Sequence, residues 1–235
     1  MTAIKPIDLT QSHDVFKAYH LGNYDDVRNA YPDVGTQYAF DVLDGKQQAG
    51  YMIQLAAFRH IRDLQRVLEK EADFPYHYDL NKVTNILKFA AICPNVDHTD
   101  EPTELMPWQA FILAQLIGWR GIDGGKRFSR AIVSVGRTNG KTYLMAIIAC
   151  YSFLVESLGL SSQDYLVASI NFKQTSKILG YIKTMLRKIL DIEPFKSLAE
   201  EVGLNPDGLS SQSDQIVQKK QNNVLRAISH ESGQY

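Results

Sequence analysis

The chain has 235 residues, 45% of them hydrophobic, which is enough to bury a substantial core in one large domain or in one domain with an N-terminal appendage. The formal net charge of −1 hides an asymmetry, since residues 1–125 carry 11 Lys and Arg against 17 Asp and Glu, whereas residues 126–235 carry 14 against 9. We expect an anionic ligand in the basic half, although an excess of that size does not by itself indicate nucleic-acid binding.

Cysteine, histidine and apolar patterning favour a cytosolic protein. Cys93 and Cys150 are far apart, and Cys150 falls on an apolar helix, where we expect a buried free thiol. The six His residues show no metal-ligand spacing. The residues near Met1 contain no long apolar run, so we expect no signal peptide. The apolar run over residues 142–160 is interrupted by polar residues, so it predicts a core helix rather than a membrane span.

The first part of the chain has helical patterning. Helix-start signals and apolar periodicity predict three helices, over residues 11–30 (starting at Ser12 and ended by Tyr31-Pro32-Asp33), 50–70 and 81–91. Residues 93–107 contain three Pro and no periodicity, which predicts a loop. We therefore expect an N-terminal helical region over residues 1–104, followed by a second region over residues 105–235.

The second region alternates strands with helices. In chain order we expect a helix over residues 106–119, a core strand over 128–135, a buried helix over 143–155, a strand over 165–170, an amphipathic helix over 172–190, a loop-rich stretch over 191–213, and a β-hairpin of residues 215–220 and 224–229. Such alternation indicates an α/β core with a mainly parallel sheet. On the helix over 172–190, Lys173, Lys177 and Lys188 lie away from the apolar face. A solvated face is the usual interpretation, and contact with DNA or a neighbouring subunit is the alternative.

The stretch 132–142 is the most informative part of the sequence. An apolar strand is expected to run into a polar loop that opens a helix, and such loops hold phosphates through backbone N–H groups and the helix dipole. Gly140 would let the backbone approach, Lys141 could reach the β- and γ-phosphates, and the Thr142 hydroxyl could ligate Mg²⁺. Val135 stands where the standard P-loop pattern has its first Gly. The alternative is an ordinary strand-to-helix turn with an exposed Lys.

Several segments, in order, resemble the large subunit of tailed-bacteriophage terminase, the ATPase that pumps DNA into a prohead. They are Tyr38-Ala39 with Asp44-Gly45-Lys46, Ala56 with residues 59–64, Leu105-Met106-Pro107-Trp108-Gln109 with Gly118-Trp119, the loop 135–142, Ala168-Ser169 with Gln174 and Lys177, and residues 223–233. The resemblance covers roughly residues 38 to 235. It implies a P-loop NTPase-like core, and members of that family commonly lack the first loop Gly.

The resemblance also implies the roles of the site residues. Gln109 would contact the adenine, with Trp108 packing behind it, although Trp108 can equally be a core anchor. The ATP-binding loop would consist of Val135, Gly136, Arg137, Thr138, Asn139, Gly140, Lys141 and Thr142. Lys141 and Arg137 would be the catalytic residues, with Arg137 facing the γ-phosphate, and Thr142 would ligate Mg²⁺. For Arg137 the alternative is an exposed loop charge.

One expected part of an ATPase does not occur in the sequence. Downstream of Thr142, no apolar strand-like run ends in an Asp or Glu that could hold Mg²⁺ or position water. In the family, that Walker B strand and a nuclease domain would come next, so we expect residues 105–235 to be the first part of the ATPase core of an N-terminal fragment.

The parent protein would hydrolyse ATP to package viral DNA, and the fragment would be inactive alone. The resemblance implies double-stranded DNA, the portal protein and the small terminase subunit as partners, a homo-oligomeric ring, and the cytoplasm of the infected bacterial host. Two alternatives remain: a truncated, non-catalytic module that binds nucleotide or motor components without turnover, and an unrelated helicase-like P-loop ATPase. Helicase loops usually keep the first Gly, which disfavours the second of these.

Overall fold

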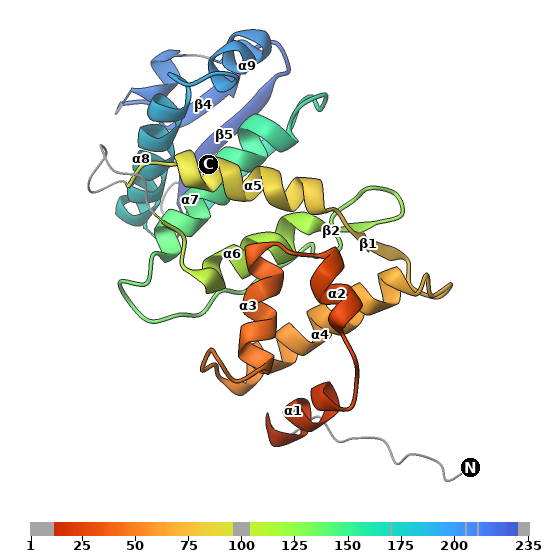
Figure 1. Ribbon diagram of the computed structural model, residues 1–235. Helices are drawn as coiled ribbons and strands as arrows, with labels where there is room; N and C mark the ends of the chain where they lie inside the picture. Colours follow the sequence, from red (N-terminus) through yellow and green to blue (C-terminus); the bar gives the residue numbers. More distant parts are fainter. Residues whose placement is uncertain (1–11, 96–103, 170, 205, 211, 230–235) are drawn as a thin grey trace. The chain divides into compact units, whose positions relative to one another are not determined.

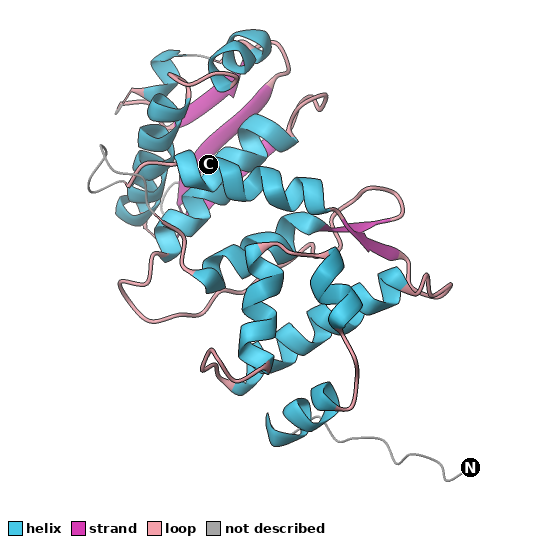
Figure 2. Ribbon diagram, viewed as in Figure 1, coloured by secondary structure: helices cyan, strands magenta, loops and turns pink. Residues whose placement is uncertain are grey.

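The computed structural model describes residues 12–95, 104–169, 171–204, 206–210 and 212–229, which form helices and two small sheets in a mixed α/β fold (Figure 1, Figure 2). The chain divides into two compact units. Unit 1 comprises Met1–Leu87 and Leu105–Ile132, and unit 2 comprises Lys88–Glu104 and Val133–Tyr235. These units do not follow the expected division after residue 104, and that division into domains stays a prediction.

Unit 1 is mainly helical. Its elements are α1 (Ser12–His20), α2 (Asp25–Ala30), α3 (Val34–Leu43), α4 (Tyr51–Leu68), the first part of α5 (Leu80–Ile92), α6 (Pro107–Leu113), the π-helix η1 (Ala114–Gly118), and an antiparallel pair of strands, β1 (Tyr76–Tyr78) and β2 (Trp119–Gly121). The predicted helices over 50–70, 81–91 and 106–119 are therefore confirmed. The pair β1–β2 was not expected, because each of its strands has only three residues.

The single helix expected over residues 11–30 is wrong: α1 and α2 are separate. Gly22 donates its backbone N–H to the Tyr19 carbonyl in a turn, and the Asn23 side chain accepts from the N–H of Asp25. Gly and Asn both favour such turns over a continuing helix. After α2, Asp33 begins the unpredicted α3 by accepting a hydrogen bond from the N–H of Thr36 at 2.9 Å, which is a standard N-cap.

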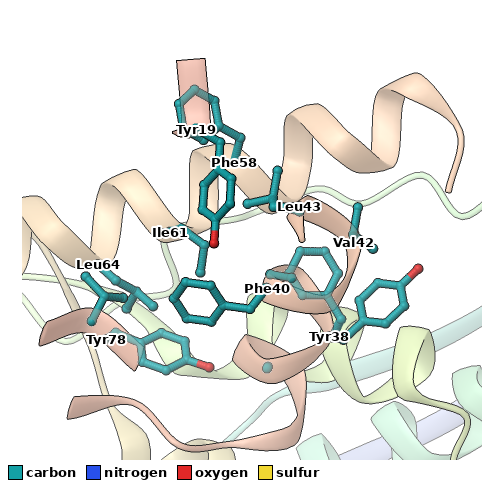
Figure 3. Packing of buried hydrophobic residues seen from close by; sticks show 14 of the residues in the cluster. Tyr19, Tyr38, Phe40, Val42, Leu43, Phe58, Ile61, Leu64 and Tyr78 are labelled. Atoms are coloured by element: carbon teal, nitrogen blue, oxygen red, sulfur yellow. The ribbon is translucent and has the colours of Figure 1, made fainter. Parts of the chain in front are cut away.

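The hydrophobic core of unit 1 lies between α3 and α4 (Figure 3). From α3, Phe40 and Leu43 point into it, and Ile61 and Leu64 meet them from the regularly spaced apolar face of α4. All four side chains are almost fully buried, and burying one of this size stabilises a fold by roughly 1.5–3 kcal/mol. The regularly spaced apolar residues that predicted α4 are thus the ones that pack into the core.

A buried polar cluster is set within this core around His60, which is fully buried. Its Nδ1 accepts hydrogen bonds from Trp119 Nε1 (3.1 Å) and Gln115 Nε2 (2.9 Å), so the ring proton is on Nε2, which donates to Thr36 Oγ1 at 3.0 Å. Thr36 Oγ1 in turn donates to Asp33 at 2.6 Å. Burial, reinforced by the charges of Arg59 and Arg127, lowers the pKa of His60 to about 3.

Unit 2 contains a three-stranded sheet of order β3-β5-β4, where β3 is Asp164–Ser169, β4 is Gln215–Gln218 and β5 is Asn223–Ser229. Strand β3 is parallel to β5, and β4 is antiparallel to it. The helices are the end of α5, α7 (Lys141–Tyr151), the π-helix η2 (Ser152–Glu156), α8 (Phe172–Ile189), α9 (Phe195–Val202) and the 3-10 helix η3 (Pro206–Leu209). The predicted strand over 165–170, the helix over 172–190 and the C-terminal hairpin are confirmed over their described residues.

One face of this sheet is buried and the other is open. Ile216 and Leu225 are fully buried on the face that α8 covers, and Phe153 of η2 packs edge-on against Tyr165 at 5.4 Å between ring centroids. On the opposite face Leu166 is 53% exposed and Ile228 is 38% exposed. Cys150 on α7 is a buried free thiol, as predicted.

Two expectations for the residues that follow β2 are wrong. The core strand over residues 128–135 is not formed, although the segment is apolar and alternating: Ile132 is 97% exposed, and no described strand pairs with it. Alternation reports which side chains can share a face, but a strand also needs a neighbouring strand to satisfy its backbone. The stretch over 191–213 contains α9 and η3 rather than loop alone. Within the described residues, one strand pairing is parallel and two are antiparallel.

No helix among the described residues is long and apolar enough to cross a membrane. The apolar run that contains α7 ends in the π-helix η2 and forms part of the packed interior of unit 2, with Ala146, Ile147 and Cys150 fully buried.

Candidate nucleotide site

The predicted phosphate loop lies in unit 2, directly before α7. Residues 136 to 140 are exposed, and two of them have the left-handed backbone that a tight loop needs: Thr138 at φ 64° and Gly140 at φ 68°. For Gly140 this conformation has no steric cost, whereas for Thr138 it is an uncommon one. Val135 does not have a positive φ, so the backbone at this position does not require Gly. This explains physically how the loop accommodates Val there.

Lys141 is the first residue of α7, and its side chain turns back over the loop. Its Nζ donates hydrogen bonds to two backbone carbonyls, those of Val135 and of Gly136, the latter at 2.8 Å. The ammonium of Lys141 therefore lies against the backbone of its own loop. Its contact with the phosphates of a nucleotide stays a prediction.

The start of α7 is open to an anion. Gly140 is its N-cap residue and makes no side-chain capping hydrogen bond, and the first turn contains no acidic residue. The first N–H groups of a helix have no partner within the helix, and together with the helix dipole they favour a negative charge. Thr142, in this same turn, is half-buried, with its hydroxyl at the helix start.

The remaining loop side chains are held by the backbone or exposed. Thr138 Oγ1 and Asn139 Nδ2 both donate to the carbonyl of Arg137, at 2.6 and 3.2 Å. These bonds fix the middle of the loop locally. Arg137 itself is exposed, and its expected direction toward a γ-phosphate stays a prediction.

Gln109 and Trp108 lie in unit 1, at the start of α6. The Gln109 side chain is buried, and its Oε1 accepts a hydrogen bond from the N–H of Met106 at 3.0 Å, which caps the helix. Trp108 packs against the hydrophobic cluster of unit 1, and its Nε1 donates to the Met106 sulfur at 3.3 Å. A structural role is thus visible for both residues, and the adenine contact of Gln109 stays a prediction.

Within the described ranges, no three His, Cys, Asp or Glu side chains lie together in a way that could hold a metal ion. Sequence reasoning expected the N–H groups at the helix start to be open to a phosphate, but it missed the left-handed backbone of Thr138, which no side-chain pattern signals.

A scan against protein-family models matches residues 107–232 to the ATPase domain of the terminase large subunit. The match spans more than half of the chain, so the chain belongs to this family. A search of solved structures finds similarity to the crystal structure of the HK97 bacteriophage large terminase, with 20% sequence identity and a TM-score of 0.47. The similarity covers 66% of this chain and 28% of that chain. The comparison with curated proteins gave no match.

Proposed function

We propose that the chain is the ATP-binding part of a terminase large subunit, the motor that packages viral DNA into proheads. One observation carries the proposal: the side chain of Lys141 lies inside a glycine-ended loop at the uncapped start of α7, in a chain of the terminase ATPase family. An ammonium and several unpaired N–H groups converging on one place suit the di- or triphosphate of a nucleotide.

In the proposed complex each loop residue has a distinct task. Lys141 leaves the carbonyls of Val135 and Gly136 and bonds to the β- and γ-phosphate oxygens, while the N–H groups of residues 136–142 surround the phosphates. The Thr142 hydroxyl ligates Mg²⁺, an ion that would neutralise charge on the β- and γ-phosphates. For Gln109 the proposed role is the contact with the adenine that the family resemblance implies.

Arg137 supplies the proposed charge that assists phosphoryl transfer. Its exposed position in the loop leaves the guanidinium able to turn toward the γ-phosphate. A planar guanidinium can donate two parallel hydrogen bonds to the transferring group, and such contacts matter most when charge spreads over the phosphoryl oxygens.

We further propose that the complete core is P-loop-like with a mainly parallel sheet, to which β3 and β5 contribute a parallel pair. The partners proposed for the whole protein are double-stranded DNA, the portal protein, the small terminase subunit and further copies of itself in a ring, in the cytoplasm of the infected host. The alternative function is a non-catalytic module that binds nucleotide or motor components.

Binding of a fluorescent ATP analogue to residues 1–235, with Lys141→Ala as the test variant, examines the nucleotide site. We expect the substitution to abolish binding, because it removes the charge that faces the phosphates. Lys196→Ala, on the exposed side of α9, is the matched control and should bind as wild type does. A folded Lys141→Ala protein with unchanged affinity would refute the nucleotide site. ATP turnover by residues 1–235 would contradict the alternative module, which binds nucleotide without hydrolysis, whereas the motor requires hydrolysis only in the parent protein.

A further inference from the structure

Helices α7 and α8 lie side by side in unit 2 and run in the same direction (Figure 1). The chain turns back after η2 to form β3, and it turns back again to begin α8 directly after β3. A hydrogen bond from Cys150 Sγ to the carbonyl of Ile182, at 3.7 Å, shows which residues of the two helices are level. Thr142 lies eight residues before Cys150, and Gln174 lies eight residues before Ile182. The first turn of α8 is therefore close to level with the first turn of α7.

Gln174 lies on the side of α8 toward β3 and α7. On the opposite side, about 180° away around the helix, Lys183 donates to carbonyls of the segment 210–213, which precedes β4. The sheet order is β3-β5-β4, so the side of α8 away from β4 is the side toward β3. The continuation of α7, the π-helix η2, packs over β3 through Phe153 and Tyr165. Gln174 is thus placed at the start of α8 next to the start of α7.

The Gln174 side chain is held by its oxygen. Ser169 Oγ, at the end of β3, donates to Gln174 Oε1 at 2.7 Å. Asn171 caps α8 by accepting from the N–H of Gln174 at 3.0 Å, and a Gln at this third helical position commonly returns a bond to the N–H of the cap residue. Here the Gln174 oxygen accepts from Ser169 instead. Among the described residues nothing accepts a hydrogen bond from Gln174 Nε2, and the side chain is exposed.

This free amide donor lies just outside the proposed phosphate site. In that site the N–H groups of residues 136–142 hold the phosphates against the start of α7. Packed helices have axes about 8–10 Å apart, so a donor on α8 lies beyond the groups that the loop itself supplies. From there it reaches only the phosphate that projects furthest from the loop.

We propose that Gln174 binds the terminal phosphate of a nucleoside triphosphate through Nε2, with Ser169 as the positioning residue that orients the amide. A diphosphate lacks this phosphate, so Gln174 determines the preference of the site for triphosphate over diphosphate. The inference rests on the proposed nucleotide site and deepens it by adding a residue outside the loop 135–142. A purely structural role is the alternative, in which Ser169 and Gln174 only join the end of β3 to the start of α8.

The test compares two ligands on the full chain in the presence of Mg²⁺: a fluorescent, non-hydrolysable β,γ-imido analogue of ATP and the matching fluorescent ADP. A hydrogen bond to a charged group is lost in Gln174→Ala, so its affinity for the triphosphate should fall at least about tenfold, while its affinity for the diphosphate stays at the wild-type value. Gln163→Ala removes an exposed Gln just before the other end of β3 and is the matched control, with both affinities unchanged. Equal loss of both ligands in a folded Gln174→Ala protein, or no loss, overturns the proposal.

Gln174→Glu separates recognition from a structural role. It keeps the shape of the side chain and an oxygen for Ser169, and an acidic residue in the first turn of a helix is favourable. A structural role therefore predicts a folded protein with the wild-type preference for triphosphate. The proposal predicts a larger loss of that preference than in Gln174→Ala, because a carboxylate cannot donate to a phosphate oxygen and repels its charge. A wild-type preference in the folded Gln174→Glu protein overturns the proposal.

Failure of this inference can be told apart from failure of the proposed function. If wild-type protein binds both ligands, Lys141→Ala binds neither, and the Gln174 variants keep the wild-type preference, the nucleotide site stands and only the role of Gln174 is removed. If Lys141→Ala binds both ligands as wild type does, or wild-type protein binds neither, the nucleotide site is refuted and the role of Gln174 with it.

Discussion

Acidification should destabilise unit 1 through His60. In the folded protein burial lowers the pKa of His60 to about 3, against an ordinary value of 6.5. Protonation would also place a proton on Nδ1, which already accepts from Trp119 and Gln115. Between the two pKa values the unfolded chain binds more protons than the folded one. The contribution of a neutral His60 to the free energy of unfolding is therefore fully present above pH 6.5 and is lost as the pH falls toward 3.

The size of this effect follows from the two pKa values. Each pH unit in the window costs about 1.4 kcal/mol, so lowering the pH from 6.5 to about 4.5 should remove about 2.7 kcal/mol of the free energy of unfolding. Small domains are stabilised by only about 5–15 kcal/mol, so the loss is a large fraction. Urea unfolding followed by tryptophan fluorescence measures it, because Trp119 contacts the His60 ring.

Two variants make the measurement specific. His60→Leu should be less stable at neutral pH, since Thr36 and Trp119 lose a buried partner, but the slope that His60 contributes should vanish. His20→Asn, at an exposed position, should keep the wild-type slope. Equal slopes in wild type and His60→Leu, or a His60 ring that titrates near pH 6.5 by NMR, would show that the burial argument is wrong.

Two further outcomes are expected. In a longer chain that includes a Walker B strand, Arg137→Ala should lower kcat far more than it lowers nucleotide affinity. Arg137→Lys should restore little of the lost kcat, because an ammonium lacks the planar fork of a guanidinium. If both Kd and kcat of Arg137→Ala stay at wild-type values, Arg137 is only a surface charge. Gly118→Ala should destabilise unit 1 by about 1–3 kcal/mol, because the added Cβ would lie 2.4 Å from Val83 Cγ2. Gly180→Ala, inside α8 and with no atom within 4 Å, should not destabilise the protein, because Ala is the better helix former. Similar melting temperatures of the two variants would contradict this packing.

Elements with strong periodicity could be predicted from the sequence, and short or partner-dependent ones could not. Helices α4 and α8 have 18 residues each and an apolar face, so their patterns contain enough turns to identify the period. Strands β1 and β2 have three residues each, which is too short for a pattern. The segment over 128–135 has a strand-like pattern, but pairing depends on a neighbour elsewhere in the chain, about which local sequence says nothing.

For the candidate site, too, some features could be predicted from the sequence and others could not. Gly140, Lys141 and Thr142 could be placed at the start of a helix because the motif is local. The capping role of the Gln109 side chain is also local, yet the family resemblance directed attention to a ligand instead. The network around His60 could not be predicted, because Thr36, His60 and Trp119 come from three segments that meet only in the folded core.

Lys141 is hydrogen-bonded to the backbone of its own loop, and this limits how sequence variation can weaken those bonds. Both acceptors are backbone carbonyls, so no replacement of the side chains at positions 135 and 136 removes them. In the proposed complex a nucleotide would have to compete with these internal bonds, so its apparent affinity would be its intrinsic affinity reduced by the fraction of loops that are open. Mutation can shift that fraction through the shape of the loop, above all at Thr138, where a Gly would relieve the left-handed backbone. Loop shape can therefore adjust the proposed affinity without any replacement of Lys141.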